Sequence, residues 1–379
     1  MVNSNANAIG IIFPNSYDNL VPELAGDRLM ASIPFAGRYR IIDFLLSSLA
    51  NCGISNIAIV VRENYHSLMD HLGSGRAWDL LRKNGGLSIF PPYAEKNMKV
   101  YSGRVEALES ILPYLKSKKE KYVIMMDANI AVDFDFNAML AEHIESGADV
   151  TVAYTEQEIP AELIRAGSHG DMYYTLKLDD GRVRRIFMNS EMCGKQNLSM
   201  NIYIMDREAL IDKIHAAFVR GYSCFERDIL APRLEKYNIR GYKYDGYYAR
   251  ICGLKSYFDE NMKLLDDENL DALFTGGQIY TKIRDDNPTR YINGCKTKNN
   301  LVADGCVIEG DVENCVLFRG VKIAKGAKIR NSVLMQDTVV NAGARLDYVV
   351  TDKNVTIEVG QELKGTDTQP FYVAKGRTV

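Results

Sequence analysis

The sequence lacks the usual marks of a secreted, membrane-inserted or nucleic-acid-binding protein. Its 46 Lys and Arg residues are spread along 379 residues with a formal net charge of −3, so no basic face for nucleic acid is expected. The chain shows no basic start followed by an apolar core, as a signal peptide would, and no apolar stretch approaches the roughly 20 residues that a membrane helix needs. We therefore expect a cytoplasmic protein without a membrane or nucleic-acid partner.

The seven cysteines are scattered singly and never form a CxxC pair. An odd number of cysteines without metal-ligand spacing is typical of reduced thiols in a cytosol. We therefore expect neither a disulfide framework nor a zinc site.

Residues 1–265 alternate short apolar runs with helical patterns. The expected strands cover 8–13, 57–61, 122–126 and 150–154, and the expected helices cover 40–51, 67–72, 105–115 and 136–146. Near-continuous apolar strands separated by helices predict an α/β domain with a mostly parallel sheet covered on both faces. Such sheets bind ligands at the carboxyl ends of their strands, so the loops that follow the strands are the first places to search for a site.

The remaining residues have a different sequence pattern. The polar stretch 266–290 is interpreted as the connection to a second domain, residues 291–379. Three seven-residue segments there share one pattern, in which the first and last residues are apolar and the central residue is glycine. They are 302–308 around Gly305, 323–329 around Gly326 and 340–346 around Gly343. Such repeats are typical of the hexapeptide turns of a left-handed parallel β-helix, which often serves as an oligomerisation surface. An ordinary β-sandwich is the alternative.

Four motifs make the sequence specific. PFAGRYRIIDF at 34–44 resembles the PFGGRYRIIDF signature of ADP-glucose pyrophosphorylases (glucose-1-phosphate adenylyltransferases), and HLGSGRAWDL at 71–80 resembles their GSGRPWDL segment. FPPY at 90–93 is similar to the family's PPY, and VIEGDVENCVLF at 307–318 is similar to the IEGEVENSVLF of its β-helix. The resemblance covers nearly the whole chain, in order. It implies a Rossmann-like nucleotidyltransferase domain and a left-handed β-helix, assembled as a tetramer.

The resemblance also implies a reaction, in which ATP and glucose 1-phosphate give ADP-glucose and pyrophosphate with magnesium, in bacterial glycogen synthesis. Attack of the sugar phosphate on the α-phosphorus is catalysed mainly by positioning and by neutralising charge. A glycine-rich phosphate loop and carboxylates that hold magnesium are therefore the groups to check against the family motifs.

The groups that would hold phosphate are replaced. Where the family has GGxGxR after the first strand, residues 15–20 read NSYDNL, so all three glycines and the arginine are gone. The family's lysine in KPAVPF falls at Met30, and the glutamine that reads adenine falls at Arg62. Its EEKP, which holds glucose 1-phosphate, falls on FMNS at 187–190, and the glycine of its SMG is Asn201. Side chains therefore occupy space that the phosphates need.

The carboxylates that would hold the metal are replaced as well. The aspartate of the family's SGDH falls at Asn129, and that of its WRDVGT falls at Arg250. An amide is a weaker, neutral ligand for magnesium, and a guanidinium repels it. Asp127 lies two residues before Asn129, and positions two apart on a strand point the same way, so Asp127 as a substitute ligand stays open.

This pattern resembles that of GlgD-type subunits, which are similar to the GlgC-type catalytic subunit and associate with it. The resemblance implies a regulatory, catalytically deficient subunit of a heterotetramer, with no catalytic and no metal-binding residue of its own and with Mg²⁺ held by the catalytic partner. Two alternatives stay open. One is a weakly active nucleotidyltransferase with a rearranged site, and the other is a homomeric sugar-phosphate sensor.

The resemblance makes five residues candidates for ligand contact. Ser199 matches the serine of SMG, and Gly103 and Glu106 match the Gly and Asp of a GTADA segment, so all three are expected near the sugar. For Glu106 the alternative is an acid that complements the dipole of a helix start. Arg38 and Arg40 match arginines near an effector pocket between the domains, where a sugar phosphate or a nucleotide would bind. Their alternative is a pair of solvated arginines before a helix.

Overall fold

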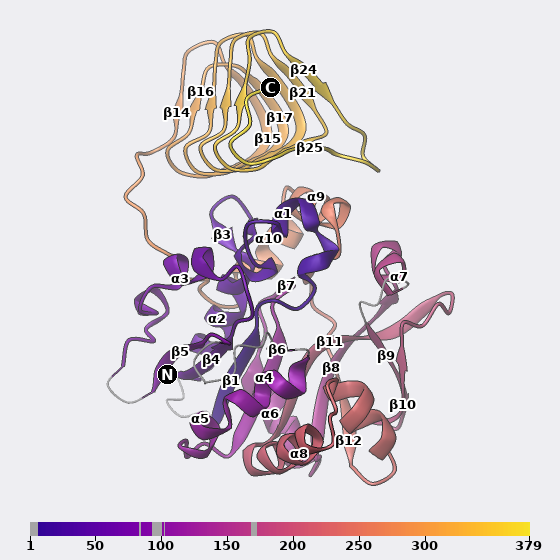
Figure 1. Ribbon diagram of the computed structural model, residues 1–379. Helices are drawn as coiled ribbons and strands as arrows, with labels where there is room; N and C mark the ends of the chain where they lie inside the picture. The colour runs from indigo at the N-terminus through magenta and orange to yellow at the C-terminus, as the bar shows by residue number, and fades with distance from the viewer. Residues whose placement is uncertain (1–6, 83–84, 93–100, 102, 168–172) are drawn as a thin grey trace.

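The computed structural model describes residues 7–82, 85–92, 101, 103–167 and 173–379. An α/β part built on one large sheet carries a coiled β-domain at one end (Figure 1). The predicted fold class, an α/β domain followed by a parallel β-helix, is confirmed. Tyr93 of the FPPY motif lies outside the described residues.

The large sheet has nine strands in the order β5-β4-β1-β6-β11-β8-β12-β10-β9. Their bounds are β1 Ala8–Phe13, β4 Asn56–Val60, β5 Gly86–Phe90, β6 Tyr122–Asp127, β8 Val150–Glu158, β9 Tyr174–Asp179, β10 Arg182–Met188, β11 Lys195–Asp206 and β12 Ile239–Lys243. β5, β4, β1 and β6 run parallel, as their apolar runs predict, and β8 and β12 form a further parallel pair. β11 runs antiparallel between β6 and β8, and β9 and β10 form an antiparallel hairpin, which the sequence patterns did not predict.

Helices cover both faces of this sheet, as predicted. Their bounds are α2 Ile41–Asn51, α3 His66–Leu72, α4 Arg104–Ser110, α5 Leu112–Lys116, α6 Phe136–Glu145 and α8 Arg207–Val219. Ile12 of β1 packs in one core with α2, α3 and α6, and Ile11 packs in the other with α4, α5 and α8, because successive strand side chains point to opposite faces. The helix expected over 105–115 is divided in two, since Pro113 has no N–H to donate and its ring crowds the preceding turn.

A bulge interrupts β11 where the strand passes the end of β6. Ser199 pairs with Tyr154 and Tyr203 pairs with Val152, so β11 has additional residues between these pairs. Asn201 lies in the bulge with a φ of 56°, a left-handed conformation that Asn and Gly adopt most readily. The replacement of the family's glycine by Asn201 therefore keeps the backbone shape and adds an amide side chain at this point.

Two parallel sheets form the sides of the β-helix. One contains β14 Arg290–Tyr291, β16 Val307–Ile308, β18 Lys322–Ile323, β20 Val339–Val340 and β23 Thr356–Ile357; the other contains β15 Lys296–Val302, β17 Asp311–Leu317, β19 Lys328–Leu334, β21 Arg345–Asp347 and β24 Glu362–Lys364, with β22 Val349–Thr351 and β25 Phe371–Val373 beside it. Residues at one position of successive coils stack on each other, so Ile308, Ile323, Val340 and Ile357 are all buried. This stacking confirms the coil repeat predicted from the sequence.

Left-handed residues lie at the corners of the coils. The three predicted corner glycines have positive φ angles: Gly305 (79°), Gly326 (80°) and Gly343 (71°). At another corner Asn299, Asn314 and Asn331 are also left-handed, and each donates a side-chain hydrogen bond to the next coil, with Asp347 as the last acceptor. This ladder fixes the phase of each coil against its neighbour.

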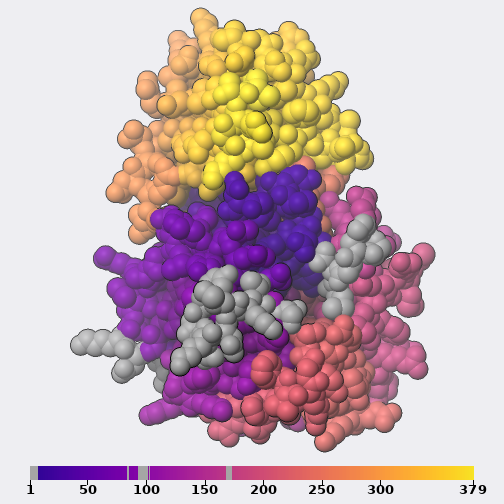
Figure 2. Space-filling view, viewed as in Figure 1, coloured from indigo at the N-terminus to yellow at the C-terminus, as the bar shows by residue number. Residues whose placement is uncertain are grey.

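The β-helix rests on the N-terminal segments of the α/β part, as the contact between the yellow and indigo atoms in Figure 2 shows. Helix α9 (Leu254–Lys263) packs on β17 and β19, and α10 (Asp267–Phe274) lies within the range expected to connect the domains. Arg28 and Asp352 form a buried ion pair across this interface. The two parts share one apolar cluster, so the interface resembles a domain core.

Two further findings concern the whole of the described chain. All seven cysteines are free thiols. Within the residues that the structure describes, no helix has both the length and the apolar character needed to cross a membrane.

Candidate functional site

The loop after β1 is closed by its own side chains. Asn15 accepts a hydrogen bond from the Arg62 N–H (2.7 Å) and donates one to Asp18 (2.9 Å). Asp18 also accepts from the Met30 N–H at 2.7 Å. The Leu20 N–H donates within the loop, to the Tyr17 carbonyl. A glycine loop of the family type points its N–H groups at phosphate, whereas this loop uses side chains and N–H groups to hold itself together.

Burial raises the pKa of Asp18 to about 7, although the hydrogen bonds from the Met30 N–H and from Asn15 favour the charged form. Desolvation disfavours the carboxylate, and its effect exceeds that of the two donors. The loop therefore presents a carboxyl group where the family presents glycine, and the group titrates near neutral pH.

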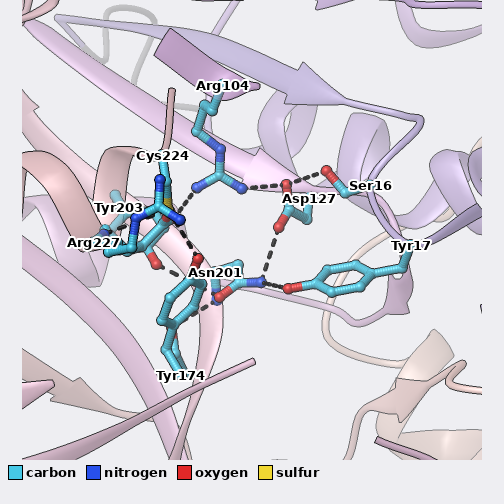
Figure 3. Close-up of polar contacts among 11 residues, drawn as sticks. Ser16, Tyr17, Arg104, Asp127, Tyr174, Asn201, Tyr203, Cys224 and Arg227 are labelled. Carbon is cyan, nitrogen blue, oxygen red and sulfur yellow. Dashed lines mark hydrogen bonds and ion pairs between the residues drawn. The ribbon is translucent and has the colours of Figure 1, made fainter. Parts of the chain in front are cut away.

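Tyr17 fills the space between the loop and β11. Its φ of 70° is left-handed, and its hydroxyl accepts a hydrogen bond from the Asn201 amide at 2.6 Å. Burial, followed by the charge of Asp127, raises the pKa of Tyr17, so the hydroxyl stays neutral. The Tyr17 hydroxyl and the Asn201 amide lie side by side next to Asp127 (Figure 3).

Asp127, at the end of β6, receives three donors. Ser16 Oγ and Arg104 Nη2 lie 2.7 and 2.6 Å from its Oδ1 atom, and Asn201 Nδ2 lies 2.9 Å from Oδ2 (Figure 3). Arg104 Nη1 also donates to Glu226. Burial opposes the charge of Arg104, but Asp127 and Glu226 outweigh it and raise the pKa of the guanidinium well above its usual value. Asp127 as a substitute metal ligand is therefore disfavoured, because this buried carboxylate already accepts three hydrogen bonds, one of them from a cation.

Asn129 and Arg250 lie next to each other, because the short strands β7 (Ile130–Ala131) and β13 (Ala249–Arg250) pair and the Ile251 N–H donates to the Asn129 carbonyl. Asn129 is 1% exposed and its amide has no hydrogen-bond partner among the described residues. Arg250 is 6% exposed and donates to the Ser199 carbonyl at 2.6 Å. A buried cation and a buried amide thus occupy the two positions, on neighbouring backbone segments, where the family motifs place carboxylates.

The donor set does not fit Mg²⁺. Magnesium prefers carboxylate oxygens, and it keeps several waters in an octahedral shell. Asp127 is occupied, Asn129 is neutral and Arg250 is positively charged. No group of three or more His, Cys, Asp or Glu side chains in the described part of the chain is arranged to hold a metal ion.

A cavity of about 330 Å³ opens at the carboxyl ends of β1, β4 and β6, and we call it the strand-end cavity. Asp127 lines this cavity, whereas Asn129 and Arg250 do not. Gly103 lines it, but Ser199 and Glu106 do not, so only one of the three predicted sugar-binding residues faces this space. A Cβ on Gly103 would lie 2.4 Å from the Ser223 carbonyl oxygen, which explains the glycine by close packing of the backbone. The strand-end cavity also presents Glu226 and Cys224, which the motif comparison did not single out.

A second cavity, of about 440 Å³, lies between the α/β part and the β-helix, and we call it the interdomain cavity. Arg38 and Arg40 both line it, as the resemblance implies. Arg40 is partly held by Ser67, to whose carbonyl and hydroxyl it donates at 2.7 and 3.0 Å. Arg38 is exposed, 3.8 Å from Asp304 in the β-helix.

Six cations line the interdomain cavity: Arg38, Arg40, Lys282, Arg284, Arg319 and Lys353. Asp70, which pairs with Lys282 at 3.2 Å, is the carboxylate in its lining. Burial, followed by the charges of Arg40 and Arg28, lowers the pKa of Lys353 to about 7, although Asp352 opposes the shift. Asp286 pairs with Arg284 at 3.1 Å and with Arg319 at 3.6 Å, so part of this positive charge is balanced. The remaining charge, with a lysine that a bound anion would help to protonate, is suited to a small anionic ligand.

Several of these residues were missed at the level of sequence. Lys282, Arg319 and Lys353 come from three distant segments, and only the fold brings them to one cavity. Arg104 could have been noticed in the sequence, since it replaces the threonine of the GTADA segment. The motif comparison considered only the family's charged groups and glycines that are missing here, so it did not detect a charge that is added.

Comparison with known proteins identifies the family to which the chain belongs. A nucleotidyl transferase family model matches residues 24–187, and a model of the GlmU-like C-terminal hexapeptide region matches residues 285–377. The chain is 37% identical to the glycogen biosynthesis protein GlgD of Geobacillus stearothermophilus and 33% identical to that of Bacillus subtilis, each over 374 residues. These alignments cover 98% of this chain and 97% of each relative. The chain belongs to the GlgD family.

Glucose-1-phosphate adenylyltransferases are also related to this GlgD family member. The enzyme of Bacillus mycoides is 32% identical over 336 residues, which cover 87% of each chain. The family resemblance inferred from the motifs is therefore confirmed. Because the GlgD relatives align over almost the whole chain, both cavities lie within the shared region.

Proposed function

We propose that the chain is a regulatory, catalytically deficient subunit of glucose-1-phosphate adenylyltransferase, which forms ADP-glucose from ATP and glucose 1-phosphate in glycogen biosynthesis. In this proposal a GlgC-type subunit supplies the catalytic site and its Mg²⁺, and the two chains form a heterotetramer. The relatives support the pathway, since two are named glycogen biosynthesis protein GlgD and another is named glucose-1-phosphate adenylyltransferase.

One observation carries the proposal. Asn129 and Arg250 stand together, buried, at the two positions where the family motifs have metal-binding aspartates. A magnesium ion bridges phosphates and neutralises charge in phosphoryl transfer, so a site with an amide and a guanidinium in place of two carboxylates loses that contribution. The closed loop at residues 15–20 removes the phosphate-binding N–H groups as well.

The regulatory part of the proposal rests on the interdomain cavity. Six cations in a space of about 440 Å³ favour a phosphorylated metabolite, and Arg38 and Arg40 are proposed to contact it. The cavity is lined by both domains, so a bound anion would change how firmly they are held together. In a heterotetramer this change would reach the catalytic partner.

The experiment is a measurement of ADP-glucose formation with Mg²⁺ by three preparations: this chain alone, a GlgC-type chain alone, and the two together. We expect background activity from this chain alone, and a higher turnover or a changed effector response from the mixture. Robust activity of this chain alone would favour a rearranged catalytic site. If the mixture has the same activity and effector response as the GlgC-type chain alone, and the two chains do not co-elute, the result would favour a homomeric sensor.

A further inference from the structure

Arg104 is held on every side in the strand-end cavity. Its two terminal nitrogens contact Asp127 (2.6 Å) and Glu226, whose side chains are 1% and 4% exposed. Its guanidinium carbon lies 5.0 Å from the ring centre of Phe13 and 5.7 Å from that of Tyr203. Two carboxylates and two aromatic faces therefore surround one cation that is 13% exposed.

We propose that Arg104 is the permanent cation of the strand-end cavity, standing between Asp127 and Glu226 in place of a divalent metal ion. The inference goes beyond the proposed function, because it concerns the charge balance of this cavity within the chain itself and involves no partner. It also identifies the chemical class that Arg104 excludes, which is a divalent cation that prefers carboxylate oxygens.

The charge balance supports this assignment. Asp127 and Glu226 are both almost fully buried, and two buried carboxylates that share a site require a counter-charge. The guanidinium supplies it with a planar set of donors, so each nitrogen faces a different carboxylate. Since Arg104 is part of the chain, its local concentration does not depend on the solution, and a metal ion has to displace it to reach either carboxylate.

The backbone explains how Arg104 reaches this position. It is the first residue of α4, and the preceding Gly103 is extended and packs against the Ser223 carbonyl. The Val105 N–H donates to that same carbonyl at 3.1 Å. This contact fixes the start of α4 beside the segment that carries Glu226, so the Arg104 side chain extends across the gap toward Asp127.

The test replaces Arg104 by the threonine of the family motif and uses Mn²⁺ as the probe. Titration calorimetry and Mn²⁺ electron paramagnetic resonance are recorded on the full chain and on Arg104→Thr. We expect the unaltered chain to show no specific Mn²⁺ site. The variant should bind one Mn²⁺ with an affinity gain of roughly tenfold or more, and Mn²⁺ should raise its melting temperature.

Two control variants make the result specific. Arg104→Thr combined with Asp127→Asn should lose the Mn²⁺ site, because a carboxylate is removed while the guanidinium is still absent. Arg227→Thr removes a nearby arginine that pairs with Asp228 instead, and it should not create a site. If Arg104→Thr does not fold, Arg104→Gln keeps hydrogen-bond donors at the position without the charge, and the same gain is expected from it.

Two results would overturn the inference. One is an Asp127-dependent Mn²⁺ site in the unaltered chain, which would show that Arg104 does not exclude the metal. The other is a folded Arg104→Thr or Arg104→Gln variant, judged by circular dichroism, that shows no Asp127-dependent Mn²⁺ binding. Neither result depends on whether the chain regulates a catalytic partner, so the failure of this inference and the failure of the proposed function are distinguishable.

Discussion

Asp352 in the β-helix accepts a hydrogen bond of 2.5 Å from Arg28 in the α/β part, and neither side chain is more than 5% exposed. Tyr372 donates to the same carboxylate at 3.2 Å, so Asp352 is held from both domains. Removing one partner of a buried ion pair leaves the other charge buried without compensation.

We expect Arg28→Ala to lower the free energy of unfolding by about 3–5 kcal/mol. The double variant Arg28→Met with Asp352→Leu should recover most of that loss, because no charge is then left buried. Denaturant unfolding of both variants gives the comparison. As a control, Arg184→Ala breaks an exposed pair with Asp179 and should cost less than about 1 kcal/mol. A double variant as unstable as the single one would contradict this account.

The loop carboxyl of Asp18 should make stability depend on pH. Its folded pKa of about 7 lies above the value near 3.8 of an exposed aspartate, so its contribution is full below about pH 4 and is lost as pH rises through 7. We expect Asp18→Asn to gain stability relative to the unaltered chain as the pH rises, so that its advantage at pH 8 exceeds its advantage at pH 5 by on the order of 1–3 kcal/mol. Thermal melts at both pH values measure this. Asp27→Asn, at an exposed aspartate, should show no such difference, and an Asp18→Asn effect equal at both pH values would count against the assignment.

Anion binding in the interdomain cavity should weaken in alkali. Lys353 has a pKa of about 7 without a ligand, and a bound anion raises this pKa. Above pH 7 the Lys353 amine therefore takes up a proton when the anion binds. We expect the affinity for sulfate, which does not titrate in this range, to fall between pH 7 and 8.5 by up to about tenfold per pH unit. Burial lowers the pKa of His71, so this neighbour is already neutral in that window.

Lys353→Arg provides the matched control for sulfate binding, because arginine keeps its charge throughout this range. Its affinity should not vary with pH, and Lys353→Met should bind sulfate weakly at every pH. Calorimetric titration with sodium sulfate measures all three chains. A pH profile that survives in Lys353→Arg would assign the effect to another group.

Restoring the two lost carboxylates should not restore catalysis. Asn129→Asp combined with Arg250→Asp returns the family's charges, but the loop at 15–20 stays closed and Arg104 still occupies Asp127. We expect no ADP-glucose formation above background from the purified double variant with Mg²⁺, and little change in the activity of an added GlgC-type chain. Turnover by the variant alone would show that these two positions suffice for the loss of activity.

Much of the scaffold follows from local sequence patterns. The strands at Ala8–Phe13, Asn56–Val60 and Tyr122–Asp127 lie within a residue of the apolar runs that predict them, because buried parallel strands read as continuous apolar segments. The hairpin of β9 and β10 was not predicted, since three arginines interrupt Arg182–Met188 and only Val183 in it is buried. A strand of this kind leaves no long continuous apolar run to detect.

The site was only partly predictable, for a physical reason. Aligned motifs identify Asn129 and Arg250 as replacements, because the position of a lost charge is defined by its neighbours in sequence. The groups that now fill the space act through contacts between distant segments, as Arg104 does with Glu226 and as Lys353 does with Arg40. Such contacts exist only once the strands are paired, so no local pattern contains them.

The asparagine ladder of the β-helix has a consequence for how this domain changes length in evolution. Asn299 and Asn314 are 15 residues apart, and Asn314 and Asn331 are 17 apart, and each must return to the same corner to bond its neighbour. A single-residue deletion on a side of the coil would carry every later corner out of phase. We expect the domain to tolerate the gain or loss of complete turns, or of residues at exposed corners, so its height varies in discrete steps.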